Sequence, residues 1–263
     1  NALTANGGSS TSFGSGLTIA TDAGKLALDS TSITSAGALT LTGATGIDFG
    51  AGVVFTAGGD LAMSTTSNDI SGTGAFTLTS TGNISLAENF TTAGATIITA
   101  DSDGSGVGDF SIDASMTLST GNNSLTLTAN DVTVSGSINS GTGSTTIAVS
   151  DGGTIGLGGT PGNMTITGTE LGNITAGTLN IGNSSTGNIT VDGISAANSN
   201  NATTVNLTTA SASSVSFSNN NSTFNALTAN GGSSTSFGSG LTIATDAGKL
   251  ALDSTSITSA GAL

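Results

Sequence analysis

The chain has 263 residues, of which 35% are hydrophobic, only 7% are charged and 41 are glycine, and its net charge is −14. Ordinary soluble domains carry about 25% charged residues, so hydroxyl and amide side chains must provide most of the contact with water here. The negative charge excludes nucleic acid and an anionic membrane surface as partners. The absence of cysteine excludes a disulfide framework, and no apolar run approaches the roughly 18 residues of a membrane span.

Short bursts in which apolar and small polar residues alternate recur along the chain, separated by Gly, Asn or Ser. This period of two predicts β-strands, and the residues between the bursts predict turns. No stretch sustains a period of 3.6 residues, so we expect an all-β fold with almost no helix. In chain order, the predicted strands and their inward residues are GLTIAT (Leu17, Ile19), GALTLTG (Leu39, Leu41), AFTLTSTG (Phe76, Leu78), ATIITA (Ile97), DFSIDAS (Phe110, Ile112), SLTLTAN (Leu125, Leu127), TTIAVS (Ile147, Val149), NMTITG (Met164, Ile166), TLNIG (Leu179, Ile181), NITVDG (Ile189, Val191), TTVNLTT (Val205, Leu207) and SVSFSN (Val215, Phe217).

A long tandem repeat is superimposed on these bursts. Residues 1–39 return without a change as residues 225–263, so Asn1 corresponds to Asn225 and the period is 224 residues. We therefore interpret residues 1–224 as one complete repeat unit and residues 225–263 as the start of the next, identical unit. The only two basic residues, Lys25 and Lys249, occupy the same position in successive copies.

Two bursts often follow each other closely, as in ALTLTGATGIDFGAG, and a looser segment then leads to the next pair. This pattern predicts the turns of a β-solenoid, whose short strands stack in parallel on those of the next turn. With roughly 20 residues per turn and about 4.8 Å between strands, one unit would contain about 11 turns and span some 50 Å. An array of β-sandwiches is the alternative, but it would contain more two-residue Asn-Gly or Asp-Gly hairpin turns.

Five Gly-Asn dipeptides stand between predicted strands. Asn side chains at a corner can form hydrogen bonds from one turn to the next. We therefore interpret them as one corner of the coil used repeatedly, and they are Gly82-Asn83, Gly121-Asn122, Gly162-Asn163, Gly172-Asn173 and Gly187-Asn188.

The couplets LTLTGATGIDFGAG and FTLTSTGNISLAE resemble the repeats of filamentous-haemagglutinin-like exoproteins, the β-helical adhesins of Gram-negative bacteria. The resemblance extends along the whole chain and implies a right-handed parallel β-helix, export to the cell surface or beyond, and a role in attachment or fibre building. It brings no catalytic residues. Repeats in such proteins are usually diverged, whereas the tandem unit here is identical wherever both copies are visible, which favours a long uniform fibre.

The chemistry-bearing residues are few. Histidine and cysteine are absent, which removes the common nucleophile systems and zinc ligands. The closest candidate for a catalytic cluster is Asp101, Asp103, Asp109 and Asp113. No Arg, Tyr, Trp or His accompanies these acids to hold a sugar, so we interpret the stretch as a solvated acidic loop followed by a strand. Calcium binding by the same loop stays open.

Threonine pairs such as Thr40/Thr42, Thr77/Thr79, Thr126/Thr128 and Thr165/Thr167 are similar to the threonine rows of ice-binding solenoids. Other residues interrupt the series, and threonine is in any case a favoured polar residue on the outside of strands. We therefore interpret these pairs as ordinary outward strand residues.

From the sequence we expect a structural, extracellular or cell-surface fibre built from tandem solenoid units, with no catalytic, cofactor-binding or metal-ligating residue. Its main partners would be adjacent identical units end to end, with lateral bundling of fibres open. The alternative is an adhesin or biofilm matrix protein that binds a surface or a glycan. A polysaccharide-processing β-helix enzyme is a third hypothesis, which would require activity that depends on Asp109 or Asp113.

Overall fold

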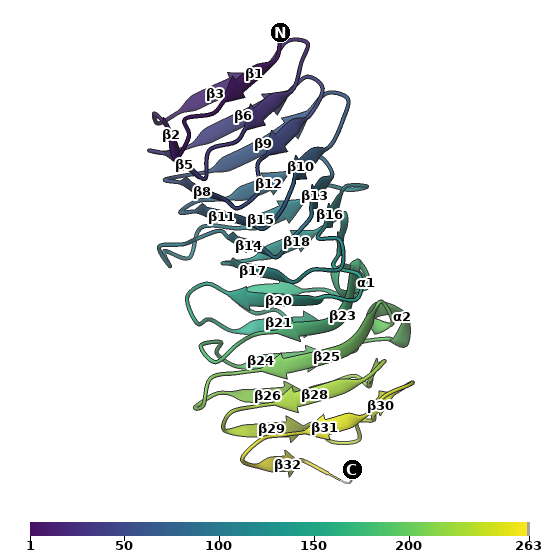
Figure 1. Ribbon diagram of the computed structural model, residues 1–263. Coiled ribbons are helices and arrows are strands. Elements are labelled where there is room, and N and C mark those ends of the chain that lie inside the picture. Colours follow the sequence, from purple (N-terminus) through teal and green to yellow (C-terminus); the bar gives the residue numbers. More distant parts are fainter. Residues whose placement is uncertain (262–263) are drawn as a thin grey trace. The chain divides into compact units, whose positions relative to one another are not determined.

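The computed structural model describes residues 1–261, which divide into two compact units. Unit 1 is Asn1–Gly141 and unit 2 begins at Thr142. The division falls inside the 224-residue repeat, and the repeat boundary between Phe224 and Asn225 lies inside unit 2. Both units are β-solenoids, as the sequence predicts, and Figure 1 shows their strands lying across the coil in successive turns. The turns, about 12 in the two units together, average about 22 residues instead of the predicted 20, and helix accounts for 3% of the chain.

Each full turn of unit 1 contributes one strand to each of three parallel sheets, which we call sheets A, B and C. Sheet A contains β1 (Leu3–Ala5), β4 (Leu26–Leu28), β7 (Ile47–Phe49), β10 (Ile70–Gly72), β13 (Phe90–Thr92), β16 (Thr117–Ser119) and β19 (Ser137–Asn139). Sheet B contains β2 (Ser10–Phe13), β5 (Ser32–Ser35), β8 (Val53–Ala57), β11 (Phe76–Ser80), β14 (Thr96–Thr99) and β17 (Leu125–Ala129). Sheet C contains β3 (Leu17–Ala20), β6 (Leu39–Gly43), β9 (Leu61–Thr65), β12 (Ile84–Leu86), β15 (Phe110–Ile112) and β18 (Val132–Val134).

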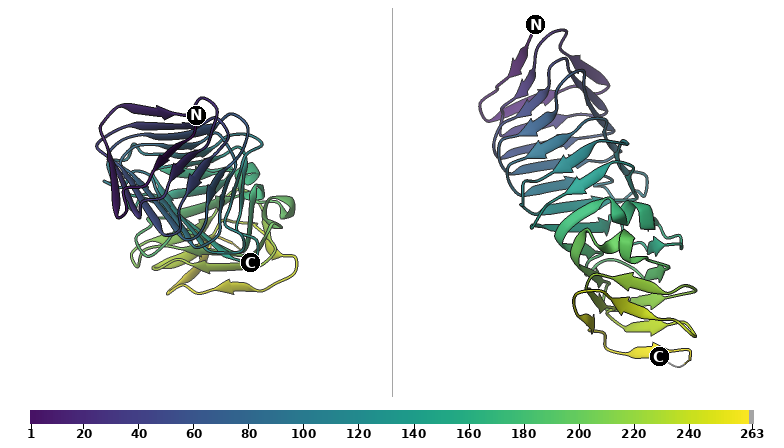
Figure 2. Two further views of the ribbon diagram at one scale, coloured as in Figure 1. Left: turned by 45° about the horizontal axis from the view of Figure 1, so that its top comes forward. Right: turned by 90° about the vertical axis from the view of Figure 1, so that its right-hand side faces the viewer.

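Unit 2 has sheets D and E and a short sheet F, again with parallel pairing. Sheet D contains β20 (Ser144–Val149), β23 (Ile174–Ile181), β25 (Ala202–Thr208), β28 (Leu227–Asn230) and β31 (Leu250–Leu252). Sheet E contains β21 (Ile155–Gly158), β22 (Met164–Ile166), β24 (Ile189–Asp192), β26 (Ser214–Phe217), β29 (Ser234–Phe237) and β32 (Ile257–Ser259). Sheet F pairs β27 (Ser222–Phe224) with β30 (Ile243–Thr245). The right-hand view of Figure 2 shows these strands stacked turn upon turn.

Two short helices, α1 (Gly168–Gly172) and α2 (Ala196–Ser199), precede β23 and β25 in unit 2, where the later turns have β27 and β30. Thr167 and Glu170 form a capping box at the start of α1, in which each side chain bonds the backbone of the other residue. Ser195 caps α2 by accepting the Asn198 N–H. The two helices contact each other, and the Asn201 amide donates to the Gly172 carbonyl at 2.6 Å.

The core is a narrow apolar column inside each unit, because alternate strand residues point inward. Almost every predicted inward residue is buried, including Leu78 and Leu127, but Leu17 in the first turn is 40% exposed. In unit 1, the rings of Phe49 and Phe76 lie 4.9 Å apart between centroids, and Phe76 and Phe90 5.2 Å apart. Offset and edge-on contacts at these distances add to the burial energy.

Ile97 is an inward prediction that the structure contradicts. Ile98 is fully buried, and Ile97 lies outside with 44% of its surface exposed. The stretch TIIT offers two adjacent apolar residues, so its own pattern does not choose between the two faces. The register with the neighbouring strands places Ile98 inward, because Ile98 pairs with Leu78 on one side and Leu127 on the other, and both are inward.

The two identical segments form closely similar strands but differ in what covers them. β28, β29 and β31 repeat β1, β2 and β4, and the pairing of Leu227 with Leu250 repeats that of Leu3 with Leu26. Leu3 is 43% exposed, whereas Leu227 is fully buried because β25 pairs with its strand. Conversely, Leu250 is 41% exposed and Leu26 is fully buried beneath β7. Stacking by the neighbouring turn, and not the local sequence, therefore decides burial.

This difference predicts unequal effects of one substitution at two identical positions. Leu227→Ala removes a fully buried side chain and should lower the free energy of unfolding by about 2–5 kcal/mol. Leu3→Ala, in the same local sequence, should cost less than half as much because the side chain is already partly in water. Urea unfolding followed by circular dichroism measures both losses, and equal losses would contradict the observed stacking.

Candidate functional site

Asp101 begins the acidic stretch that the sequence singles out, and its carboxylate is bound by its own loop. It lies just after β14, is 1% exposed and has a positive φ of 53°. Its Oδ1 accepts the Ser105 N–H at 2.8 Å and the Ser105 hydroxyl at 2.9 Å, and Oδ1 and Oδ2 both accept the Gly106 N–H at 3.1 Å. The interpretation as a solvated loop is therefore wrong for Asp101, whose side-chain oxygens accept the hydrogen bonds that hold the loop closed.

Asp103, Asp109 and Asp113 are exposed, and Asp103 and Asp109 accept hydrogen bonds from different parts of the chain. Asp103 shares the Ser105 N–H with Asp101 through a longer contact of 3.4 Å. Asp109 Oδ1 accepts the Asp131 N–H and the Asn130 amide of the following turn, at 3.1 and 2.9 Å. Within residues 1–261 there is no group of three or more acidic residues placed to hold a metal ion.

Asp109 belongs to a ladder of side-chain oxygens along one corner of unit 1. Asp60, Asn83 and Asp109 immediately precede β9, β12 and β15, respectively. Asp60 Oδ1 accepts the Asn83 N–H at 2.8 Å, and Asn83 Oδ1 accepts the Asp109 N–H at 2.9 Å. Each oxygen thus pairs a backbone N–H of the next turn at a corner, where an unpaired buried N–H would be costly.

The five Gly-Asn dipeptides do not share one corner, contrary to the sequence interpretation. Within unit 1, Asn83 precedes a strand of sheet C, whereas Asn122 precedes a strand of sheet B; within unit 2, Asn163 and Asn188 precede strands of sheet E. Asn122 has a positive φ of 69° before β17, and Asn173 caps the end of α1. The predicted bonding between turns is confirmed for Asn83 and for Asn188, whose Oδ1 accepts the Ser214 N–H at 2.9 Å.

Asp192 is a buried carboxylate that the sequence reading missed. It ends β24 in unit 2 and is 6% exposed. Its Oδ2 accepts the Asn219 amide at 3.0 Å, and its Oδ1 accepts the Asn220 N–H at 3.0 Å and the Asn220 amide at 2.8 Å. The Asn219 bond, aided by those from Asn220 and opposed by burial, lowers the pKa of Asp192 below its ordinary 3.8. Gly158, with a φ of 87°, allows the chain to pass its carbonyl, because an added Cβ would lie 2.2 Å from that oxygen.

A single ion pair is present among the described residues, between Lys25 Nζ and Asp48 Oδ2 at 2.7 Å. It joins two successive turns of unit 1. Burial would raise the pKa of Asp48, but hydrogen bonds from Lys25 and Ser71 and the charge of Lys25 together lower it. Both ionic partners are substantially exposed, so the pair fixes register more than it adds stability.

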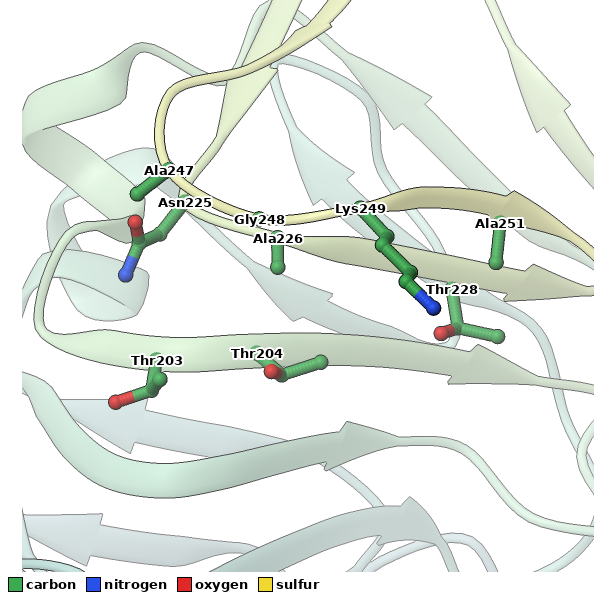
Figure 3. A pocket seen from close by; sticks show the side chains of 9 residues that line it. All are labelled: Thr203, Thr204, Asn225, Ala226, Thr228, Ala247, Gly248, Lys249 and Ala251. Atoms are coloured by element: carbon green, nitrogen blue, oxygen red, sulfur yellow. The ribbon is translucent and has the colours of Figure 1, made fainter.

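An open groove on unit 2 crosses three successive turns near the end of the described chain. Figure 3 shows Lys249, which immediately precedes β31, extending across this groove toward Thr228 of β28. The remaining lining is small, chiefly threonine and alanine, including Thr203, Thr204 and Ala251. Within residues 1–261, Lys249 has no acidic partner, whereas Lys25 at the same repeat position has Asp48. The groove thus lies at the edge of the coil beside β31 and contains no cluster of reactive groups.

The four threonine pairs lie on several faces, and only two of the pairs lie on the same face. Thr77/Thr79 and Thr126/Thr128 lie on the outer side of sheet B, in two columns that continue through all six strands. The first column is Ser10, Ser32, Val54, Thr77, Ile97 and Thr126, and the second is Ser12, Thr34, Thr56, Thr79, Thr99 and Thr128. Thr40/Thr42 lie on sheet C, and Thr167 caps α1, so neither joins these columns.

Comparison of the chain with models of protein families, with curated proteins and with solved structures finds no match. The fold therefore defines the class by itself: a β-helical repeat protein with parallel sheets. No helix in residues 1–261 is long and apolar enough to cross a membrane.

The carboxylate of Asp192 predicts a dependence of stability on pH. Its folded pKa lies below the ordinary value, so its bonds stabilise the fold above pH 3.8 and are lost as the pH falls through the folded pKa. Asp192→Asn should lower the free energy of unfolding at pH 7 by about 1–3 kcal/mol, because the Asn amide would face the Asn219 amide, donor to donor.

Thermal unfolding at pH 7 and pH 3 tests this assignment. The melting temperature of the unsubstituted chain should fall on acidification, and the fall should be smaller in Asp192→Asn. Asp246→Asn, at an exposed carboxylate of the same unit, is the control and should retain the full pH dependence. An unchanged pH response in Asp192→Asn would show that the bound carboxylate does not contribute as described.

Proposed function

We propose that the chain is a segment of an extracellular structural fibre in which tandem 224-residue units form one long β-solenoid. The observation that carries this proposal is the repeat boundary itself. β27 ends at Phe224, the last residue of the first 224-residue repeat. β28 begins three residues later at Leu227, without a linker. β28 belongs to the second copy and pairs with β25 of the first repeat and with β31 of its own copy, so the boundary falls within an ordinary turn.

The mechanism of such a fibre is mechanical. Within each compact unit, successive turns are joined by parallel backbone hydrogen bonds and by contact of inward side chains, as where the rings of Phe217 and Phe237 stack at 5.2 Å across the repeat boundary. Extension along the axis would have to break many of these bonds together. Repeat proteins gain stability from neighbouring repeats in this way, and stacked ends leave fewer open strand edges.

The extracellular location is supported by the resemblance to filamentous-haemagglutinin-like exoproteins and by the absence of cysteine. The identity of the repeats supports a fibre whose length is set by copy number. Adhesion is the second candidate function, favoured by the outer face of sheet B, where two uncharged columns present hydroxyl and methyl groups at regular spacing. Saturable binding of this chain to a glycan or a solid surface would support that role.

Length as a function of copy number tests the fibre directly. At about 22 residues per turn and about 4.8 Å between turns, each added 224-residue unit should lengthen the particle by about 50 Å. Electron microscopy of chains with one, two and three units followed by residues 225–263 measures this increment. Straight rods with equal increments are expected, whereas beads on flexible connections would refute the fibre.

A further inference from the structure

The C-terminal edge of unit 2 is an open end of the solenoid at which apolar residues are exposed to solvent. It is formed by β30, β31 and β32, and Leu250 and Ile257 are 41% and 47% exposed. A cavity of about 300 Å³ opens at this edge, lined by Phe237, Leu241, Thr242, Ile243, Leu250 and Leu252. An uncovered parallel edge of this kind is a template for one further strand in each sheet.

The same residues occur covered elsewhere in the same chain, which identifies what fits this edge. Leu26 and Ile33 are identical in sequence context to Leu250 and Ile257 and are fully buried. They are covered by the turn that follows, since Leu26 pairs with Ile47 and Ile33 pairs with Phe55.

The covering turn also supplies the residues that the cavity lacks. In the first copy, Ile19 pairs with Leu41 and Leu28 pairs with Phe49, and Leu41 and Phe49 are at most 1% exposed. Ile19 and Leu28 correspond to Ile243 and Leu252, which line the cavity. A leucine and a phenylalanine placed in this register would therefore fill it.

The charge of Lys249 favours the same covering turn. Lys25 reaches forward to Asp48 of the following turn, whereas Lys249 extends back across the groove of Figure 3. An acidic residue at the position equivalent to Asp48 would give Lys249 the partner that Lys25 has. An ion pair at one place in each repeat fixes the register of stacking more than it stabilises the fold.

We propose that the edge formed by β30, β31 and β32 is a docking surface for a segment with the sequence of residues 40–60. The segment adds one strand to each of the three sheets, fills the cavity with the equivalents of Leu41 and Phe49, and pairs its aspartate with Lys249. This inference rests on the proposed fibre, in which the segment belongs to the next unit, but its test does not require fibres.

The test extends the full chain after Leu263 by 21 residues with the sequence of residues 40–60. Amide hydrogen exchange of residues 250–259 should slow by more than about tenfold. An extension of the same composition in scrambled order is the matched control and should leave exchange fast. Fast exchange in both extended chains would overturn the proposal.

The two lysines provide an independent readout, because the chain has no others. In the 263-residue chain, Lys249 should be acetylated faster than Lys25, and in the extended chain the two rates should converge. In an extension that carries Asn in place of the aspartate equivalent to Asp48, Lys249 should stay fast although residues 250–259 remain protected. Unequal rates in the extended chain would overturn the pairing of Lys249. A protected edge together with beaded multi-unit particles would uphold the docking and refute the fibre.

Discussion

The backbone of one solenoid turn cannot satisfy its own hydrogen bonds, and every other feature of this chain depends on that constraint. In unit 1, a strand of three to five residues has no partner within its own turn, so its N–H and C=O groups pair with the turns before and after. A turn is therefore stable only when it is stacked. The two copies of residues 1–39 show this directly, because each buries the residues that the other exposes.

Corners require a separate solution, since the chain leaves the parallel ladder there. Asp60, Asn83 and Asp109 provide an oxygen that accepts the first N–H of the next turn, and Asp192 does the same in unit 2 through Asn220. This explains the use of acidic residues in a chain with so few charges. Most of the carboxylates that the structure ties down hold corners and loops, so the negative charge follows from architecture as much as from solubility.

Much of the fold could be predicted because the period of two is a property of each strand alone. Leu125 and Leu127 alternate with threonines and are buried as expected. Ile97 could not be placed in the same way, because TIIT has two apolar neighbours and only the register with Leu78 and Leu127 selects Ile98. The turn length was underestimated because loops such as the one after Asp101 lengthen some turns. The helix α1 did carry a signal, the capping box from Thr167 to Glu170, which strand periodicity obscures.

The buried carboxylates were less accessible to sequence reasoning. Asp101 looks like any acid in a Gly-Ser loop, and its burial depends on the loop folding back so that Ser105 and Gly106 reach it. Asp192 depends on residues of the following turn. The partners of Asp101 lie only four and five residues away but no motif marks them, whereas those of Asp192 lie a full turn away, so the stacking must be known first.

Hydrogen exchange on the full chain tests the central claim most directly, because the chain contains its own control. The amides of residues 227–229 and residues 3–5 belong to identical sequences, and only the first group lies between two turns. The account predicts strong protection at residues 227–229 and weak protection at residues 3–5. Equal protection in the two segments would contradict it.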